Sequence, residues 1–428
     1  MQSIGDPYII RPGRPADIDR CAELNEAVHP YPGIGSWTRD LFEGHPRVRP
    51  DDFLVAERAD GTGIVAALLG IRQTWTFGGV RLPVTQPELV GTDPGHRGQR
   101  LAGRLLDALH ARCSRDGTAL QVIEGISYFY RRFGYDYALR PGDARDIPAA
   151  ELAEPPASHA AGILIRPAVP ADAPALARVD ETVARRDVLA CPRDERVWAH
   201  EISGHRPDST VRRGVMAVLD AAGAVAGYLV HGLRLGTDGS LPVLAAVCAD
   251  QGLWPLAVPG MRRRLAEAGA AAATPQRPFT SLRLLLPAAH PLARSASPGV
   301  FRRPRAWYAR TGDPAALLDH WLPVVARRWR EQDLRWPGET MVIDTYHQWI
   351  TLRFADGAPV SARAEPRRDA ATPHVAVPPA ALLHLLLGNR GLGEALDLWP
   401  DVIVHDPAAE AFLAAGFPAV PPEIWPVA

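Results

Sequence analysis

A loop rich in glycine and arginine is the first part of the sequence whose residue types could do chemistry. Residues 93–103, DPGHRGQRLAG, follow the apolar stretch ELVGT and precede the helical stretch RLLDALHARC. The first N–H groups of a helix lack partners inside it, and the helix dipole adds partial positive charge there. Gly95 and Gly98 would permit a tight turn and the close approach of an anion, and Arg97 and Arg100 would add positive charge. The loop is therefore predicted to bind a phosphate group, although it matches neither GxGxxG nor a loop ending in GK[ST].

A cluster of aromatic residues lies further along the chain, in YFYRRFGYDYA (128–138). A phenol such as that of Tyr130 can donate a proton to a departing group. Tyr128 would lie on the same face of an extended chain and is the second candidate for this role. The alternative is that the cluster packs in the core, as aromatic clusters usually do.

The elements that would position these residues occur twice. IIRPGRPADIDRCAEL (9–24) recurs as LIRPAVPADAPALARV (164–179), and each copy predicts a short strand, a proline turn, an aspartate cap (Asp17, Asp172) and a helix. Each copy continues into two apolar strands joined by a glycine turn, a further strand and a helix. The second copy has DQGLWPLAVPG (250–260) where the first has the arginine loop, so a structural role is predicted for it.

Near residue 311 the pattern changes to an amphipathic helix, a strand pair and further helical sequence. We therefore predict an α/β (α+β) fold with three domains. The domains are residues 1–150, which carry the loop, residues 160–310, which form its second copy, and residues 311–428, a smaller α+β domain. ELAEPPASHAAG (151–162) is predicted to link the two copies.

The composition excludes several classes of protein. The 428 residues carry a net charge of −1, and 47% are hydrophobic and 22% charged, which predicts a soluble globular protein without a basic field for nucleic acid. Neither a membrane-spanning run nor a signal-peptide pattern occurs, so a cytoplasmic location without a membrane partner is expected. All 47 basic residues are arginines, which excludes a lysine base or Schiff base. The four scattered cysteines predict buried thiols and neither a disulfide framework nor a metal site.

The order of loop, helix and aromatic cluster resembles a known family. A strand, R-G-x-x-L-A, a helix and then Y-x-x-x-G-Y are similar to the GCN5-related N-acetyltransferases (GNAT). The whole chain resembles their enhanced intracellular survival (Eis) type, in which an acetyltransferase domain and a degenerate second copy precede a sterol-carrier-like domain. The resemblance implies two tandem GNAT-fold domains, acetyl-CoA as the acyl donor, an amine as acceptor, and a homo-oligomer, which is a hexamer in relatives.

The resemblance also assigns the cofactor contacts. The strand before the loop would pair its backbone with the pantetheine arm, the loop would hold the pyrophosphate, and the end of the neighbouring strand would open the groove. In this order the residues are Val90, Gly91 and Thr92; Arg97, Gly98, Gln99, Arg100, Leu101, Ala102 and Gly103; and Ile123 and Glu124.

Arg100 stands where the family pattern Q/R-x-x-G-x-G/A has its middle glycine. If this residue has helical dihedral angles, an arginine costs little strain and could itself pair with a phosphate. If the phosphate must touch the backbone there, the Cβ obstructs it and the cofactor is weakened or lost. We favour retention of the cofactor, because Gly98 and Gly103 remain available to relieve the crowding.

By the same resemblance, Tyr130 is the general acid beside the leaving sulfur, and the base is the chain's own terminal carboxylate on Ala428. The tail FPAVPPEIWPVA suits this role, because its prolines stiffen it and Trp425 can anchor it.

A carboxylate on the central strand is the alternative base. Glu88, two residues before Val90, would point to the same face as Val90 and Thr92 if the strand alternates regularly. Asp93 is predicted to be a turn residue instead.

Acceptor contacts are expected from the segment after the first helix, NEAVHPYPGIGSWTRDLF (25–42). His29, Tyr31, Trp37 and Phe42 in this segment indicate a roomy aromatic pocket. The alternative is a loop rich in proline and glycine that only caps the core.

These observations together predict an acetyl-CoA-dependent N-acetyltransferase that acts on an amine of a small molecule or peptide by direct attack. One alternative is a catalytically silent scaffold whose C-terminal domain binds an apolar ligand or a protein partner. The other is a GNAT fold repurposed for biosynthetic chemistry without coenzyme A.

Overall fold

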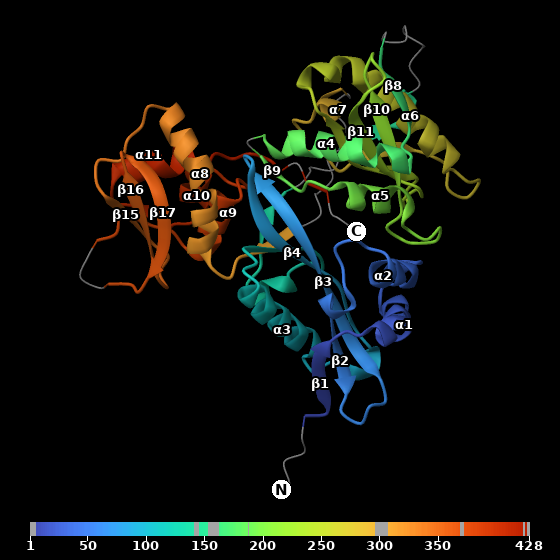
Figure 1. The fold of residues 1–428 in the computed structure, drawn as a ribbon, viewed down its shortest axis with the longest axis horizontal. Coiled ribbons are helices and arrows are strands. Elements are labelled where there is room, and N and C mark those ends of the chain that lie inside the picture. Colours follow the sequence, from blue (N-terminus) through green and yellow to red (C-terminus); the bar gives the residue numbers. More distant parts are fainter. Residues whose placement is uncertain are drawn as a thin grey trace.

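The computed structural model of the chain contains three β-sheets with helices packed on them (Figure 1). It describes residues 6–140, 145–152, 162–186, 188–295, 307–368, 372–422 and 424–425. The sheets of this described part have eight, six and five strands, and we call them, with their helices, the first, second and third units. The predicted α/β fold class is confirmed. Ala428 and most of the predicted linker 151–162 lie outside the described residues.

The first unit carries the predicted loop. Its strands follow the order β1-β2-β3-β4-β5-β14-β6, and β9 pairs with β3. The strands are β1 Tyr8–Pro12, β2 Phe53–Arg58, β3 Ile64–Phe77, β4 Val80–Thr92, β5 Leu120–Glu124, β6 Asp136–Leu139, β9 Leu189–Ala190 and β14 Trp307–Arg310. Side chains alternate across this sheet, so Leu68 packs against α3 (Leu101–Arg115) and Leu69 packs against α2 (Ile34–Glu43). Helix α1 (Ile18–Val28) lies beside α2 on the same face (Figure 1).

The second unit has the strand order β7-β13-β12-β11-β10-β8. The strands are β7 Arg145–Pro148, β8 Leu164–Pro167, β10 Arg213–Leu219, β11 Val225–Gly232, β12 Ser240–Cys248 and β13 Ser281–Leu284. Helices α4 (Ala173–Ala184) and α5 (Glu195–Ser203) pack in one core cluster, and α6 (Trp254–Ala271) and α7 (Pro291–Arg294) pack in another. The two helix pairs lie on opposite faces of the sheet, as α3 and the pair α1 and α2 do in the first unit.

The repeated sequence takes the same local form in both units. Arg11 pairs with Asp17 through two hydrogen bonds of 2.7 and 3.0 Å, and Arg166 pairs with Asp172 through two of 2.7 and 2.8 Å. Both aspartates precede a helix as predicted, but neither caps its helix. Each accepts the N–H three residues earlier instead, which closes the turn that leads into the helix.

Two strands cross the predicted domain boundaries. β7 comes from the region assigned to the first domain, yet it pairs with β13 of the second sheet. β14 comes from the end of the second region, yet it lies between β5 and β6 of the first sheet. A short strand joins whichever sheet offers it an open edge, and local similarity along the chain carries no information about that edge. Boundaries at residues 150 and 310 therefore each separate a strand from its sheet.

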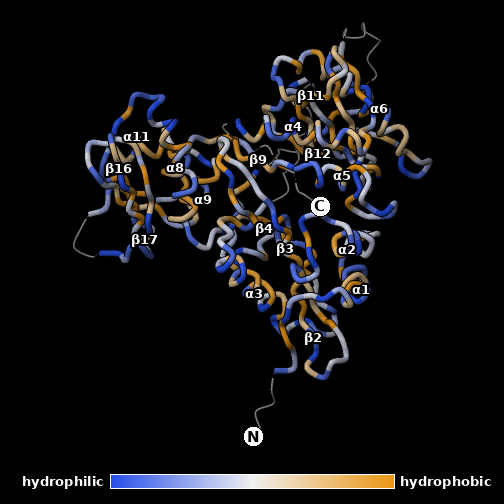
Figure 2. Tube along the Cα trace, in the orientation of Figure 1, coloured by the Kyte–Doolittle hydropathy of each residue, from blue (hydrophilic) through white to orange (hydrophobic). Residues whose placement is uncertain are grey.

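The third unit follows β14. Its strand order is β17-β16-β15-β18-β19, with β15 Thr340–Asp344, β16 Trp349–Ala355, β17 Ala358–Glu365, β18 Val375–Ala376 and β19 Ile403–Val404. Its helices are α8 Pro314–Glu331, α9 Pro379–Leu386, α10 Leu392–Leu398 and α11 Pro407–Gly416. Trp321 of α8 contacts Phe77 of β3, with the ring centroids 4.8 Å apart, so the core of this unit is continuous with one end of the first sheet. In Figure 2 the apolar segments accordingly run through all three units.

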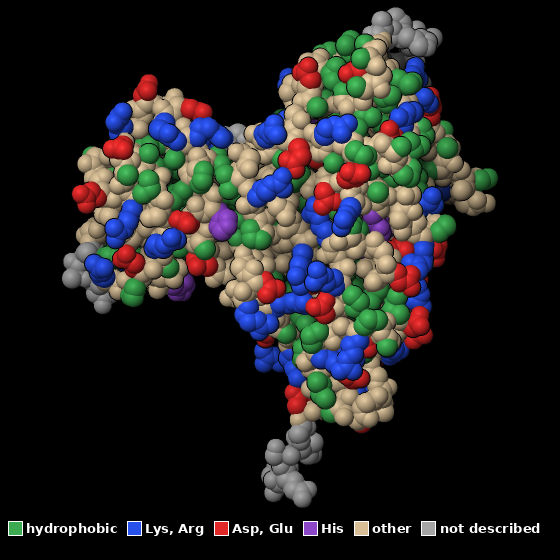
Figure 3. Space-filling model, viewed as in Figure 1, with side chains coloured by type: hydrophobic (Ala, Val, Ile, Leu, Met, Phe, Trp, Pro, Cys, Tyr) green, Lys and Arg blue, Asp and Glu red, His purple; other side chains and the backbone are tan. Residues whose placement is uncertain are grey.

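The predicted character of the cysteines is confirmed: Cys21, Cys113, Cys191 and Cys248 are all buried and unpaired. On the face drawn in Figure 3, basic and acidic side chains are interspersed, in keeping with the net charge of −1. Within the described ranges, none of the helices combines the length and the apolar character that crossing a membrane requires.

Candidate functional site

Strands β4 and β5 part at the end that faces the loop. They run parallel, and their pairing covers only Val84 with Leu120 and Thr85 with Gln121, although both strands continue further. The opposite edges of both strands stay paired, β4 with β3 and β5 with β14. Beyond Thr85 and Gln121 the two facing backbone edges are therefore available to an extended ligand.

A β-bulge in β4 lies in this opening. Leu89 has a φ of 54°, and the register with β3 shifts between Ala67 and Leu69. Such a conformation costs a leucine on the order of 1–3 kcal/mol and is concentrated at functional sites in proteins.

The bulge overturns the predicted direction of the Glu88 side chain. Glu88 pairs with Leu69 and Gly91 pairs with Ala67, so Glu88 and Gly91 share a face. Val90 instead packs with the core cluster on the α3 side. The extra residue of the bulge shifts the alternation by one position, and the prediction that Glu88 faces the same way as Val90 and Thr92 is wrong.

The loop after β4 has the backbone geometry of a tight turn. Asp93 accepts a 2.9 Å hydrogen bond from the N–H of Gly95, which confirms it as a turn residue. Gly98 has a φ of 81°, and a Cβ there would meet no atom within 4 Å. Arg97 and Arg100 are exposed and form no ion pair with any described residue. The loop therefore offers open space and two unneutralised arginines directly before α3.

Arg100 adopts a left-handed conformation, with a φ of 57° and a ψ of 23°. This is not the right-handed helical geometry in which an arginine causes little strain. The left-handed conformation costs about 1–2 kcal/mol. It is the conformation that glycine adopts readily, so the backbone follows a path suited to glycine although an arginine is present. The Arg100 side chain does not cap α3, which leaves the first N–H groups of the helix for an anion.

The other loop residues divide into two groups. Gln99 is exposed and Ala102 is partly exposed. Leu101 is buried in the core, so only its backbone can face a ligand. A Cβ on Gly103 would lie 3.2 Å from the Phe133 ring, so this glycine serves helix packing and does not relieve crowding around a phosphate.

Tyr130 lies directly beside the end of β5. It begins a short 3-10 turn, Tyr130–Phe133, is 4% exposed, and packs its ring against Gly125, where a Cβ would come within 2.3 Å of it. Its hydroxyl makes no hydrogen bond with any described residue, whereas that of Tyr308 donates to the carbonyl of Ile126 at 3.1 Å and that of Tyr135 contacts His110 at 3.1 Å. Burial raises the pKa of Tyr130, so its hydroxyl keeps its proton.

Tyr128 does not share a face with Tyr130, because residues 126–129 form a turn and not an extended strand. It is 71% exposed and has a φ of 65°, and its N–H donates to the Tyr137 hydroxyl at 2.8 Å. The two tyrosines that the sequence treats as equivalent candidates are therefore in opposite environments.

A carboxyl group with a raised pKa faces this opening. Burial raises the pKa of Glu88 to about 7, assisted by the charge of Glu124 and opposed by the Gln86 amide, which donates to Glu88 at 2.7 Å. The charge of Glu88 in turn adds to the raised pKa of Tyr130. Ile123, the other residue expected at the groove, is buried beside Tyr130 in the same core cluster.

The four predicted acceptor residues do not gather around one pocket. Trp37 is buried in the core and Phe42 stacks on Phe53 with centroids 4.0 Å apart, while Tyr31 is 55% exposed. His29 is the member closest to the opening: its Nε2 lies 3.4 Å from where a Cβ of Gly91 would be, and it has no partner among the described residues.

The second unit completes this side of the opening, which the sequence did not indicate. The Ser36 hydroxyl donates to Asp208 at 2.7 Å, and Val211 packs in the same cluster as Leu89. The segment after α1 is therefore fixed between the two units.

Comparison with known proteins agrees with this geometry. Residues 9–138 match the family model described as an acetyltransferase (GNAT) domain. This range contains the opening between β4 and β5, the loop and Tyr130, so the part of the chain that is similar to this family is the part that carries these features. No curated protein matches the chain.

Solved structures that share the fold extend over more of the chain. A GCN5-related N-acetyltransferase from Anabaena variabilis is 14% identical, with a TM-score of 0.70 over 97% of this chain and 99% of that chain. Eis1 from Mycobacterium abscessus is 17% identical, with a TM-score of 0.61 over 98% of this chain and 99% of that chain. An N-myristoyltransferase from Saccharomyces cerevisiae with bound myristoyl-CoA is 10% identical, with a TM-score of 0.50 over 72% of this chain and 79% of that chain.

Proposed function

We propose that this protein transfers an acyl group, most simply acetyl, from coenzyme A to an amine of a small molecule or peptide. The observation that carries the proposal is the joint geometry of one end of the first sheet. Two parted strands, a loop with open space at Gly98, and the buried hydroxyl of Tyr130 converge there. Each of these features fits a different part of an acyl-CoA.

The backbone edges and the loop fit the cofactor. The edge of β4 at Val90, Gly91 and Thr92 can pair with an extended amide-containing arm. The first N–H groups of α3, together with Arg97 and Arg100, can neutralise a pyrophosphate. Acyl-CoA supplies the activated thioester, and the remaining chemistry is proton transfer.

Two proton transfers are needed, and the chain has groups for both. The acceptor ammonium must lose a proton before its nitrogen attacks the thioester carbonyl, and the departing thiolate must gain one. The Tyr130 hydroxyl, protonated and without a hydrogen-bond partner among the described residues, is the proposed donor to the thiolate.

For the base, Glu88 is one proposed group, because a pKa of about 7 lets the carboxylate take up a proton near neutral pH. The terminal carboxylate of Ala428 remains the other, and it lies outside the described residues.

The acceptor is proposed to enter between the segment after α1 and the second unit, where His29 lies beside Gly91. Burial lowers the pKa of His29, so its ring is neutral near pH 7 and does not repel an ammonium group.

Calorimetric titration of the full chain with acetyl-CoA, followed by a thiol-release assay with a panel of amines, tests the proposal. Saturable binding and amine-dependent thiol release are expected. No binding up to millimolar acetyl-CoA would refute it and favour a silent GNAT fold. Parallel titration with longer acyl-CoA thioesters assigns the acyl group.

A further inference from the structure

The chain returns to the second unit near its end, and Trp425 packs there. Trp425 is 7% exposed and belongs to the core cluster of Trp198 and Tyr228. Described residues of the tail line a cavity of about 430 Å³ together with residues 244–247 and 285–287. The latter two segments are where β12 and β13 part, because the pairing of these strands ends at Val243 and Leu284. The described tail residues, 420–422 and 424–425, therefore lie at the opening in the second sheet that corresponds to the proposed cofactor site in the first.

Arg193 holds this tail by two different contacts. Its guanidinium carbon lies 3.3 Å from the centre of the Trp425 ring, in a cation–π arrangement. Its Nη2 also donates to the Trp425 carbonyl oxygen at 3.0 Å. The first contact fixes the ring of Trp425 and the second fixes its backbone.

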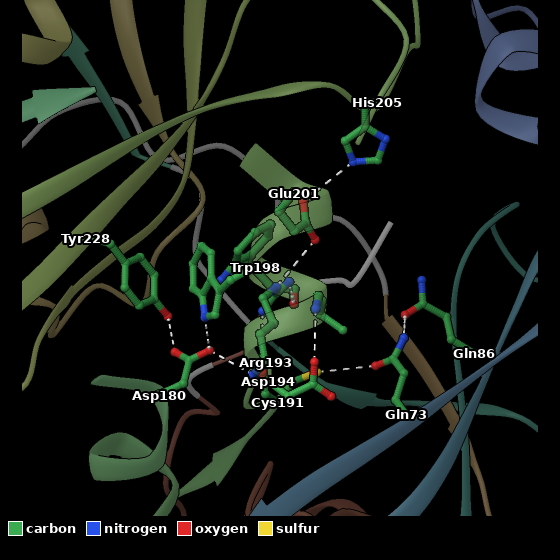
Figure 4. Close-up of polar contacts among 12 residues, drawn as sticks. Gln73, Gln86, Asp180, Cys191, Arg193, Asp194, Trp198, Glu201, His205 and Tyr228 are labelled. Carbon is green, nitrogen blue, oxygen red and sulfur yellow. Dashed lines mark hydrogen bonds and ion pairs between the residues drawn. The ribbon is translucent and has the colours of Figure 1, made fainter. Parts of the chain in front are cut away.

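Arg193 is itself held rigidly, because it is 2% exposed and bonded on several sides. Its Nε lies 3.4 Å from Glu201, and its backbone N–H donates to Asp180 at 2.8 Å (Figure 4). Asp180 also accepts from the Tyr228 hydroxyl at 2.7 Å and from the Trp198 indole at 3.1 Å. A buried ion pair often adds no more stability than apolar packing of similar volume. The contacts of Arg193 on several sides nevertheless restrict its side chain to one geometry.

The segment from β9 to Arg193, residues 189–193, connects Trp425 to the first unit. β9 pairs with β3, and the Cys191 thiol donates to Gln73 at 3.3 Å (Figure 4). Gln73 donates to Gln86 at 2.6 Å, and Gln86 donates to Glu88 at 2.7 Å. A continuous series of hydrogen bonds thus runs from Glu88 in the proposed site to the segment that holds Trp425.

We infer that Arg193 is a positioning residue, which fixes Trp425 and thereby limits the region that the terminal carboxylate, one of the two proposed bases, can reach. The three residues after Trp425 can span at most about 11 Å, so fixing Trp425 confines the terminal carboxylate to that radius. A confined group has a high effective concentration, whereas a free tail would lose it. This inference rests on the proposed transfer reaction, and it assigns the opening of the second sheet a role as the receptor for the tail.

Two variants test the inference. Trp425→Leu removes the stacked ring, and Arg193→Lys keeps the charge beside Glu201 but loses the planar group. Trp336→Leu is the matched control, because Trp336 is 5% exposed and stacked on Phe354 in the third unit. In a timed digestion with a broad-specificity carboxypeptidase, followed by mass spectrometry, trimming should stop at Trp425 in the wild type and the control. It should proceed past residue 424 in both test variants, and equal trimming in all four proteins would overturn the inference.

Kinetics provide the second measurement. Both test variants should lower kcat at least tenfold while the KM for acetyl-CoA changes less than twofold. Removing residues 426–428 from the Trp425→Leu variant should lower kcat no further, because the terminal carboxylate of this variant is no longer held in position. An unchanged kcat, or losses that add, would overturn the inference. If the wild type transfers no acyl group to any amine, the proposed function fails, and the digestion still decides whether Arg193 holds the tail.

Discussion

The first and second sheets open in the same way but are followed by different loops. β4 parts from β5 and β12 parts from β13, and Asp250 accepts from the N–H of Gly252 at 2.8 Å, as Asp93 does from Gly95. α6 then starts at Trp254, four positions after Asp250, whereas α3 starts at Leu101, eight positions after Asp93. The four additional residues are 97–100.

These four residues carry most of the difference between the two loops that bears on the proposed anion site. Gly98 and Arg100, both with positive φ, and the two exposed arginines lie in them. Pro255 in the first turn of α6 also lacks the N–H group that an anion would use. The comparison shows that both units have the opening, whereas the proposed anion site depends on four residues that only the first unit has.

Removing the hydroxyl of Tyr130 should have the largest effect and tests whether the opening of the first unit, unlike that of the second, is catalytic. Tyr130→Phe should lower kcat by about 10³-fold with little change in acetyl-CoA affinity, because a positioned general acid contributes about 10²–10⁴-fold. Tyr135→Phe is the control: it is equally buried, but its hydroxyl bonds His110 and Gln121. Steady-state kinetics and calorimetry measure both effects, and equal activity of wild type and Tyr130→Phe removes this residue from the mechanism.

A smaller effect is expected for Glu88, one of the two proposed bases. Glu88 acts only when deprotonated, so kcat/KM should rise with pH and level off above about pH 7. Glu88→Gln should remove this rise and lower kcat/KM about 10²-fold at pH 8. A pH profile of both proteins checks this. A rise near pH 7 that persists in the variant would assign the base elsewhere.

Substitution of one glycine in each unit tests the loop directly. Gly98→Ala and Gly223→Ala place a Cβ at φ values of 81° and 79°, each with open space around it. Both should cost about 1 kcal/mol of stability in urea denaturation, because alanine is strained at such angles. Only Gly98→Ala should lower the affinity for acetyl-CoA, by about tenfold. Equal acetyl-CoA affinities of the two variants would show that Gly98 does not contact the cofactor.

The smallest effect concerns Arg100. Arg100→Gly relieves about 1–2 kcal/mol of strain and costs about 0.5–1 kcal/mol of chain entropy, so the free energy of unfolding should rise by up to about 1.5 kcal/mol. Loss of the positive charge should lower the affinity for acetyl-CoA a few-fold, and the loss should be larger at low salt, where charges are less screened. Asp333→Gly, at a φ of 56°, should show the stability gain alone. Unchanged acetyl-CoA affinity at low salt would mean that the Arg100 side chain makes no phosphate contact.

The sequence by itself determined the features that depend on neighbours along the chain. These are the α/β class, the repeated strand, turn and helix, the glycine and arginine loop, the turn at Asp93 and the buried character of the cysteines. Each follows from local periodicity, turn chemistry or residue polarity, which need no knowledge of distant contacts.

Only the tertiary structure decided the features that depend on pairing between distant segments. The bulge at Leu89 reverses the face of Glu88, and the turn before Tyr130 buries this tyrosine while exposing Tyr128. One sequence signal could have pointed to the polar cluster around Arg193. Asp180 occupies the position in the second copy that Asn25 occupies in the first, and both residues are polar and buried. The partners of Asp180, however, come from α5, β11 and the segment of Arg193, which the chain brings together only when it folds.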